Sequence, residues 1–180
     1  ADGAVLAAWS DPASVDGGFK AAVERSDQAL VAVGTIQTSP SVLSSLVVAF
    51  DAAGKILWRM QPKLADGVEL RSVVGVAGGG FVAAGRDTTG GVPHLRLRRH
   101  TDAGDLVWSR SHHFFGEAGL EPHVGALMVL PKGGYALAAV ANGQINALVR
   151  ADDSGHLSCQ EAGGCAAVEM DACDDKNVCT

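Results

Sequence analysis

The stretch DAAGKILW, residues 51–58, recurs twice further along the chain. Its second copy is TDAGDLVW at residues 101–108, and its third copy is DDSGHLSC at residues 152–159. The glycines at the fourth position of the copies are 50 and then 51 residues apart. Residues 2–6, DGAVL, have their glycine 51 residues before that of the first copy and resemble the end of an earlier one. An internal repeat of this length governs the interpretation of the whole fold.

A short apolar run precedes each copy and forms a second landmark. These runs are LVAVG at residues 30–34, FVAAG at residues 81–85 and YALAA at residues 135–139. Around its landmarks the middle repeat reads as four short strands, at residues 70–76, 81–86, 94–100 and 105–111. Glycines separate the first two strands (residues 78–80) and the last two (residues 102–104), where hairpin turns need positive φ angles. The repeat therefore predicts β-structure.

Residue alternation supports the third of these strands. Leu95 and Leu97 would face one side of the sheet, and Arg96 and Arg98 the other, as in a half-buried strand. The equivalent strands of the first and third repeats, residues 45–51 and 145–151, are more apolar. We expect both of them to be covered on both faces by neighbouring sheets.

Four antiparallel strands per repeat, at a period near 51 residues, are typical of a β-propeller blade. The expected fold is all-β, a partial β-propeller of four-stranded antiparallel blades. Residues 1–160 would hold a leading strand at 3–10 and blades at about 19–62, 70–111 and 124–160, followed by a cysteine-bearing tail at 161–180. Three blades are too few for a ring, which usually needs about four to eight. We therefore expect the first and last copies each to present an apolar face that a protein partner, another copy or missing sequence covers.

The Asp-x-x-Gly-x-x-x-Trp pattern around residues 51–58 resembles the repeat of quinoprotein-type (PQQ-like) propellers. The combination of Gly-Gly-Phe-x-x-x-Gly with this pattern is more similar to secreted repeat proteins of bacteria rich in Gly and Ala. The resemblance implies that Trp58 and Trp108 dock between adjacent blades. In the third copy Cys159 takes the tryptophan position, so that blade would dock less tightly there or be tied covalently.

Composition excludes several function classes. A net charge of −6 argues against a general nucleic-acid binder, which needs an excess of Lys and Arg. No apolar run approaches the roughly 20 residues of a membrane span. The chain begins at Ala1 instead of Met, which is expected of a mature form after signal removal or of a piece of a longer protein.

All four cysteines lie in the last 22 residues, at Cys159, Cys165, Cys173 and Cys179. Such clustering suggests paired thiols in an oxidising compartment, and hence a secreted or cell-envelope protein. Of the three pairings that four cysteines allow, we favour Cys159 with Cys165 and Cys173 with Cys179 because each closes a short loop. Non-reducing peptide mapping would identify the pairing.

Candidate chemistry is sparse. His112, His113 and His123, with two glutamates between them, are metal-ligand types, but their spacing fits no standard set and favours a solvated loop between blades. Acidic residues of the tail invite a calcium interpretation but lack the EF-hand spacing. The arginines of the middle repeat form either one basic face or an ordinary polar edge balanced by Asp87, Asp102 and Asp105, and we favour the edge.

No Gly-x-Ser-x-Gly elbow and no phosphate-binding glycine loop occurs in the sequence, so we assign no catalytic residue and no cofactor. The leading hypothesis is a non-catalytic secreted or envelope scaffold whose loops or exposed blade faces bind a protein or ligand. The alternative is a fragment of a propeller enzyme, of quinoprotein dehydrogenase or lyase type, with its active site on other blades. Fold alone does not separate these hypotheses.

Overall fold

The computed structural model describes residues 16–39, 42–60, 66–89, 91, 93–112, 122–141 and 145–158. Within these ranges the chain forms twelve strands joined by turns and no helix, so the predicted all-β class is confirmed. No helix long and apolar enough to cross a membrane occurs in this part of the chain. The predicted leading strand at residues 3–10 and the tail at 161–180 lie outside the described residues.

The strands form three four-stranded antiparallel sheets in which each strand pairs with its neighbour in the sequence. The first sheet contains β1 (Asp16–Glu24), β2 (Leu30–Ser39), β3 (Val42–Phe50) and β4 (Ile56–Met60). The second contains β5 (Val68–Gly75), β6 (Phe81–Asp87), β7 (His94–His100) and β8 (Leu106–His112). The third contains β9 (Pro122–Val129), β10 (Tyr135–Ala141), β11 (Ile145–Ala151) and β12 (Leu157–Ser158).

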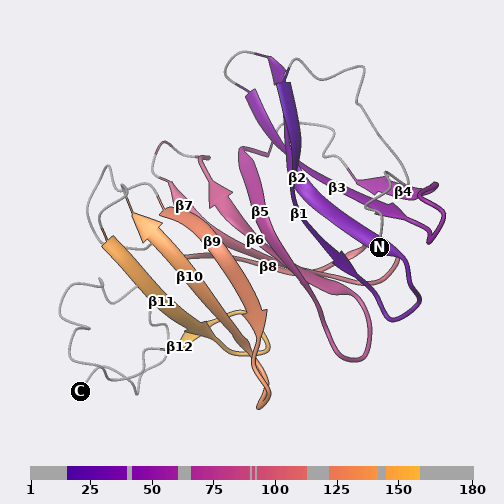
Figure 1. Ribbon diagram of the computed structural model, residues 1–180. Coiled ribbons are helices and arrows are strands. Elements are labelled where there is room, and N and C mark those ends of the chain that lie inside the picture. Colours follow the sequence, from indigo (N-terminus) through magenta and orange to yellow (C-terminus); the bar gives the residue numbers. More distant parts are fainter. Residues whose placement is uncertain are drawn as a thin grey trace, which may run out of the picture.

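The three sheets lie face to face, with the second sheet between the first and the third (Figure 1). β5 packs across β1, β2 and β3, and β9 packs in the same way across β5, β6 and β7. One apolar core fills the space between the first two sheets, and a second core fills the space between the last two. The middle sheet is therefore covered on both faces, which accounts for the run of buried residues Phe81–Gly85 in β6.

The repeated motif forms the same hairpin turn in each sheet. In each copy the backbone N–H of the first motif residue donates to the carbonyl of the fifth, and the glycine N–H donates back to the first. The φ angles of Gly54, Gly104 and Gly155 are +81°, +92° and +81°. Residues with a side chain rarely adopt this left-handed conformation, so the turn requires glycine at this position.

Trp58 and Trp108 both contact the motif turn of the following sheet. A Cβ added to Gly104 would lie 3.2 Å from the Trp58 ring, and one added to Gly155 would lie 2.5 Å from the Trp108 ring. The Trp58 indole N–H also donates to the Asp102 carbonyl at 3.2 Å. Each half-buried indole thus links its own sheet to the sheet formed by the next repeat.

These indoles pack against aromatic side chains at the start of the second strand of the following sheet. Trp58 stacks on Phe81 with ring centroids 6.2 Å apart, and Phe81 in turn stacks on His100 at 5.0 Å. Trp108 meets Tyr135 edge-on, also at 6.2 Å. Phe81 and Tyr135 hold equivalent places in the repeat, so the contact between neighbouring sheets is repeated as well.

The expectation that residues 45–51 and 145–151 are both covered on two faces is wrong for the second segment. β3 is buried on both faces, but Leu148 on β11 is 84 % exposed and Met128 on β9 is 56 % exposed. The reason is position, because no further sheet of the described chain packs beyond the third. We call this surface the open face of the third sheet and define it by Ala126, Met128, Ala136, Ala138, Leu148 and Arg150.

The other end of the stack also differs from the expectation of an exposed apolar face. Side chains of the first sheet that point away from the second form a small cluster with Ile36, Leu46 and Val48 at its centre. These three residues are 2 %, 0 % and 0 % exposed. The centre of the apolar surface at this end is therefore covered, whereas Phe19 and Leu30 of the same sheet are 37 % and 39 % exposed.

Candidate functional site

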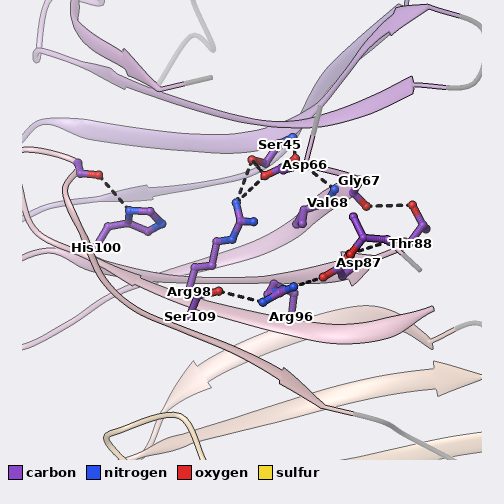
Figure 2. Close-up of polar contacts among 12 residues, drawn as sticks. Ser45, Asp66, Gly67, Val68, Asp87, Thr88, Arg96, Arg98, His100 and Ser109 are labelled. Carbon is purple, nitrogen blue, oxygen red and sulfur yellow. Dashed lines mark hydrogen bonds and ion pairs between the residues drawn. The ribbon is translucent and has the colours of Figure 1, made fainter. Parts of the chain in front are cut away.

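Charged side chains gather between the first and second sheets, next to their apolar core (Figure 2). The origin of this gathering is the alternation of β7. Leu95 and Leu97 point into the core shared with the third sheet, so Arg96 and Arg98 point the opposite way, toward the first sheet. The sequence pattern predicted this division correctly, and of the two acidic partners it named Asp87 but not Asp66.

Asp66 is the centre of one polar group. Its carboxylate accepts hydrogen bonds from the Ser45 hydroxyl at 2.6 Å and the Ser45 backbone N–H at 2.8 Å. Arg98 donates to the same carboxylate at 2.7 Å and to the Ser45 hydroxyl at 3.1 Å. The Val68 backbone N–H adds a fourth contact, at 3.2 Å. Because Ser45 lies on the first sheet, Arg98 on the second and Asp66 just before β5, this group joins the two sheets.

Electrostatics at Asp66 favour its ionised form. Burial alone would raise the pKa of the carboxyl, but the hydrogen bonds from Ser45 and from the Arg98 guanidinium outweigh burial and hold the pKa below its ordinary value of 3.8. A carboxylate with a lowered pKa is a weak base. It therefore leaves the Ser45 hydroxyl unactivated as a nucleophile.

Asp87 is the centre of a second group at the end of β6. The Arg96 guanidinium binds the Asp87 carboxylate and also donates to the Ser109 hydroxyl at 3.2 Å. The Thr89 hydroxyl and backbone N–H donate to Asp87 at 2.6 and 2.8 Å. Burial would raise the pKa of this carboxyl, but the bonds from Thr89 and Arg96 hold it below its ordinary value. This group braces the second sheet internally.

The remaining arginines of the middle repeat are also bound within the chain. Arg71 and Arg86 pair with the buried Glu69 on β5, at 2.7 and 3.3 Å. Arg99 donates to the carbonyls of Gly79 and His100 at 2.6 and 2.9 Å. These arginines therefore serve contacts inside the stack, and their acidic partners include Asp66 and Glu69, which the sequence analysis did not select.

Of the three histidines that the sequence analysis weighed as metal ligands, His112 and His123 lie on different strands, and His112 is buried and not in a solvated loop. His112, at the end of β8, donates from its Nε2 to the Gly155 carbonyl at 2.8 Å and is 7 % exposed. His113 lies outside the described residues, and His123 lies on β9. No group of three or more His, Cys, Asp or Glu side chains with the geometry for a metal ion occurs among the described residues.

Sequence analysis missed His100, which plays a part similar to that of His112. Its Nδ1 binds the Gly104 carbonyl at 3.0 Å, and its side chain is buried. Burial lowers the pKa of both His100 and His112 below the ordinary 6.5, although the hydrogen bond to each glycine carbonyl opposes this. Both imidazoles thus bind a motif turn in the neutral form. The signal available in the sequence was the position of each histidine at the last residue of a strand.

The cavities lined by described residues include two small polar ones. One, of about 260 Å³, is lined by Lys132, Arg150, Asp152, Asp153 and the glycines of the β9–β10 turn. The other, of about 170 Å³, lies at the side of Thr35 and Glu69 near β1 and β5. Both are below the roughly 300 Å³ at which small-molecule pockets begin, and both have room for water.

The cysteines Cys159, Cys165, Cys173 and Cys179 lie outside the described residues, so their pairing stays a prediction.

In the comparisons with known proteins, no family model fits the sequence, and no curated protein is similar enough to be recognised as a relative.

Proposed function

We propose that the chain is a non-catalytic scaffold of β-propeller type, from a secreted or cell-envelope protein, that binds a protein partner through the open face of the third sheet. The propeller part of the proposal is supported by three equivalent four-stranded sheets that stack through equivalent tryptophan contacts. The export part is supported by the clustered cysteines of the sequence.

One observation carries the binding role, namely the contrast between the inside of the stack and its open end. Charged side chains between the sheets bind one another, as in the groups around Asp66 and Asp87, and so are not directed toward a substrate. Large apolar side chains at the open face, by contrast, are exposed to solvent, with Leu148 at 84 %. Exposed apolar surface of this kind marks protein interfaces.

The test is capture of partners by a matched set of proteins. Wild type, Leu148→Glu and Leu57→Glu are immobilised and exposed to the secreted and envelope fractions of the producing cells, and bound proteins are identified by mass spectrometry. Leu57 is 52 % exposed on β4, away from the open face, and so provides the control. We expect proteins that bind wild type and Leu57→Glu but not Leu148→Glu.

Two results would contradict the proposal. The first is equal recovery of every bound protein by Leu148→Glu and wild type, which would exclude the open face as the binding surface. The second is turnover of a substrate by the purified protein that is lost when Ser45 or Asp66 is replaced, because that would make the polar group between the sheets catalytic.

A further inference from the structure

Three side chains of β8 contact the motif turn of the third sheet. Trp108, Arg110 and His112 are each two residues apart on the strand, so they point to the same side of it. A Cβ added to Gly155 would lie 2.5 Å from the Trp108 ring and 3.2 Å from the Arg110 Cγ. The His112 Nε2 binds the Gly155 carbonyl at 2.8 Å. Because β8 belongs to the second sheet, these contacts attach the third sheet to the second.

His112 is the residue of these three whose charge changes near neutral pH. Its side chain is buried, and the neutral ring donates from Nε2 to the Gly155 carbonyl. A further proton would bind at Nδ1 and give the buried ring a positive charge. Among the described residues, the ionisable groups that face it are Arg96 on β7, Arg110 on its own strand and His156 in the turn of the third sheet.

These neighbours do not supply a negative charge to a protonated His112. Arg96 is bound to Asp87, and His156 is paired with Asp152 of its own turn at 3.6 Å. Burial and, to a smaller extent, the positive charges hold the pKa of His112 below its ordinary value of 6.5, although the hydrogen bond to the turn opposes them. The contact between the second and third sheets therefore favours the neutral ring.

The contact between the first and second sheets depends on carboxylates instead. Ser45 of the first sheet and Arg98 of the second both bind Asp66. The pKa of Asp66 is lowered below 3.8, so this carboxyl keeps its charge in mild acid. Arg25, in the turn between β1 and β2, binds the Asp102 carbonyl at 2.7 Å and the Asp102 carboxylate at 3.1 Å. The two contacts between sheets therefore respond to different ranges of pH.

His100 is a buried histidine of the second sheet that binds within its own sheet. Its Nδ1 binds the Gly104 carbonyl at 3.0 Å, and its ring stacks on Phe81. The charged groups that face it, Arg98 and Arg99, lie on its own strand. His100 thus provides a matched control, a buried imidazole that titrates without attaching the third sheet.

We propose that protonation of His112 releases the motif turn at Gly155 from β8, so that acid loosens the contact between the second and third sheets while the contact between the first and second holds. A released ring lies in water and binds a proton as an ordinary histidine does, whereas the docked ring binds it more weakly. Docking is therefore complete above pH 6.5 and weakens as the pH falls below it, by at most about tenfold per pH unit for one proton. This device is independent of the proposed binding role.

Hydrogen exchange of single amides, followed by NMR from about pH 7.5 to about pH 4.5, tests the proposal on the intact chain. The Gly155 amide, which donates to the Asp152 carbonyl, reports on the turn. The Ser45 amide, which donates to the Asp66 carboxylate, reports on the contact between the first and second sheets. After correction for the intrinsic pH dependence of exchange, we expect protection at Gly155 to fall below pH 6.5 together with the titration of the His112 ring. Protection at Ser45 should fall less.

Three glutamine variants assign the response. His112→Gln keeps an amide donor for the Gly155 carbonyl but takes up no proton, so protection at Gly155 should lose its dependence on pH. His156→Gln, at an exposed position, should reduce the loss because it removes one of the positive charges that face His112. His100→Gln is the matched control and should leave the response at Gly155 unchanged.

Near-ultraviolet circular dichroism at neutral pH confirms that each variant is folded. Constant protection at Gly155 in the wild type down to about pH 4.5 would overturn the proposal. Equal losses at Gly155 and Ser45 would overturn it too, as would a loss at Gly155 that persists unchanged in both His112→Gln and His156→Gln.

Discussion

Asp66 illustrates how single polar residues hold the sheets in register. It precedes β5, yet its carboxylate binds Ser45 of the first sheet and Arg98 of the second. The side chains of Asp66 and Arg98 are 16 % and 17 % exposed. Loss of either partner would leave the other as a largely buried charge without compensation, which is costlier than loss of the pair.

A double-mutant cycle at this pair measures its contribution to stability. We expect Asp66→Ala to lower the free energy of unfolding by about 2 to 4 kcal/mol, and Ser45→Ala by about 1 to 2 kcal/mol. Asp66→Ala combined with Arg98→Ala should cost less than the sum of the single changes by about 1 kcal/mol or more. Urea unfolding followed by tryptophan fluorescence provides the values. Strict additivity would show that the contact does not join the two sheets.

Buried ionisable residues predict two steps in the pH dependence of stability. His100 and His112 have lowered pKa values, so the folded chain keeps them neutral while the unfolded chain protonates them. Their contribution is complete above pH 6.5 and is lost as the pH falls below it. Asp66 and Asp87 also have lowered pKa values, so their contribution is complete above pH 3.8 and is lost as the pH falls below that.

Urea unfolding at a series of pH values checks both steps. The control is the double variant His100→Gln with His112→Gln, which removes the titrating rings and keeps an amide donor at each position. We expect the decline that begins near pH 6.5 to flatten in this variant, while the decline below pH 3.8 remains. An unchanged first step would assign it to other groups.

At the scale of elements, the motif turn forms the surface on which the indole of the preceding sheet packs. Gly155 meets the Trp108 ring, whereas Gly78, which has a similar φ of +87°, has nothing within 4 Å of an added Cβ. Alanine at either glycine therefore has the same cost of a left-handed backbone conformation. Only alanine at Gly155 would also meet the Trp108 ring. The two glycines form a matched pair for testing whether the turn receives the ring.

Alanine at each glycine separates these two costs. We expect Gly78→Ala to lower the unfolding free energy by about 1 to 2 kcal/mol, the cost of the backbone conformation alone. Gly155→Ala should cost clearly more, because its methyl group overlaps the Trp108 ring. In a Trp108→Ala background the difference should shrink to the smaller cost of moving the Arg110 side chain, whose Cγ lies 3.2 Å from the added Cβ. A constant difference in that background would mean that Trp108 does not pack on this turn.

Strand positions could be predicted from the sequence because local signals determine them. In the middle repeat the expected strands at 70–76, 81–86, 94–100 and 105–111 correspond to Val68–Gly75, Phe81–Asp87, His94–His100 and Leu106–His112. Glycines fix the turns, and residue alternation fixes the faces. The ends shift by one or two residues where side-chain contacts continue a strand, as His112 does through Gly155.

The polar site could not be predicted in the same way because its partners are distant in the sequence. Ser45, Asp66 and Arg98 meet through the packing of two sheets, and no spacing rule relates them. The exposure of Leu148 had a similar cause. The sequence of β11, which contains Leu148, is as apolar as that of a covered strand. Whether a neighbouring sheet covers β11 depends on the position of its sheet in the stack.

At the scale of the whole molecule, each sheet contacts its immediate neighbours, so the second sheet depends on both of the others (Figure 1). Stability of such a stack is approximately the sum of the terms within sheets and the terms between neighbours. At the open face of the third sheet, the stabilising contact with a neighbouring sheet is missing. A partner that covers this face would therefore stabilise the third sheet most.

Nuclear Overhauser contacts between each indole and the turn glycine of the next sheet test the central claim, the stacking of repeated sheets, most directly. We predict contacts between the Trp58 ring and the Gly104 Hα protons, and between the Trp108 ring and those of Gly155, together with ring-current shifts of both glycines. Trp58→Ala should remove the first set alone, and Gly78 should show neither effect. Unshifted Gly104 and Gly155 resonances without indole contacts would contradict the stacked arrangement.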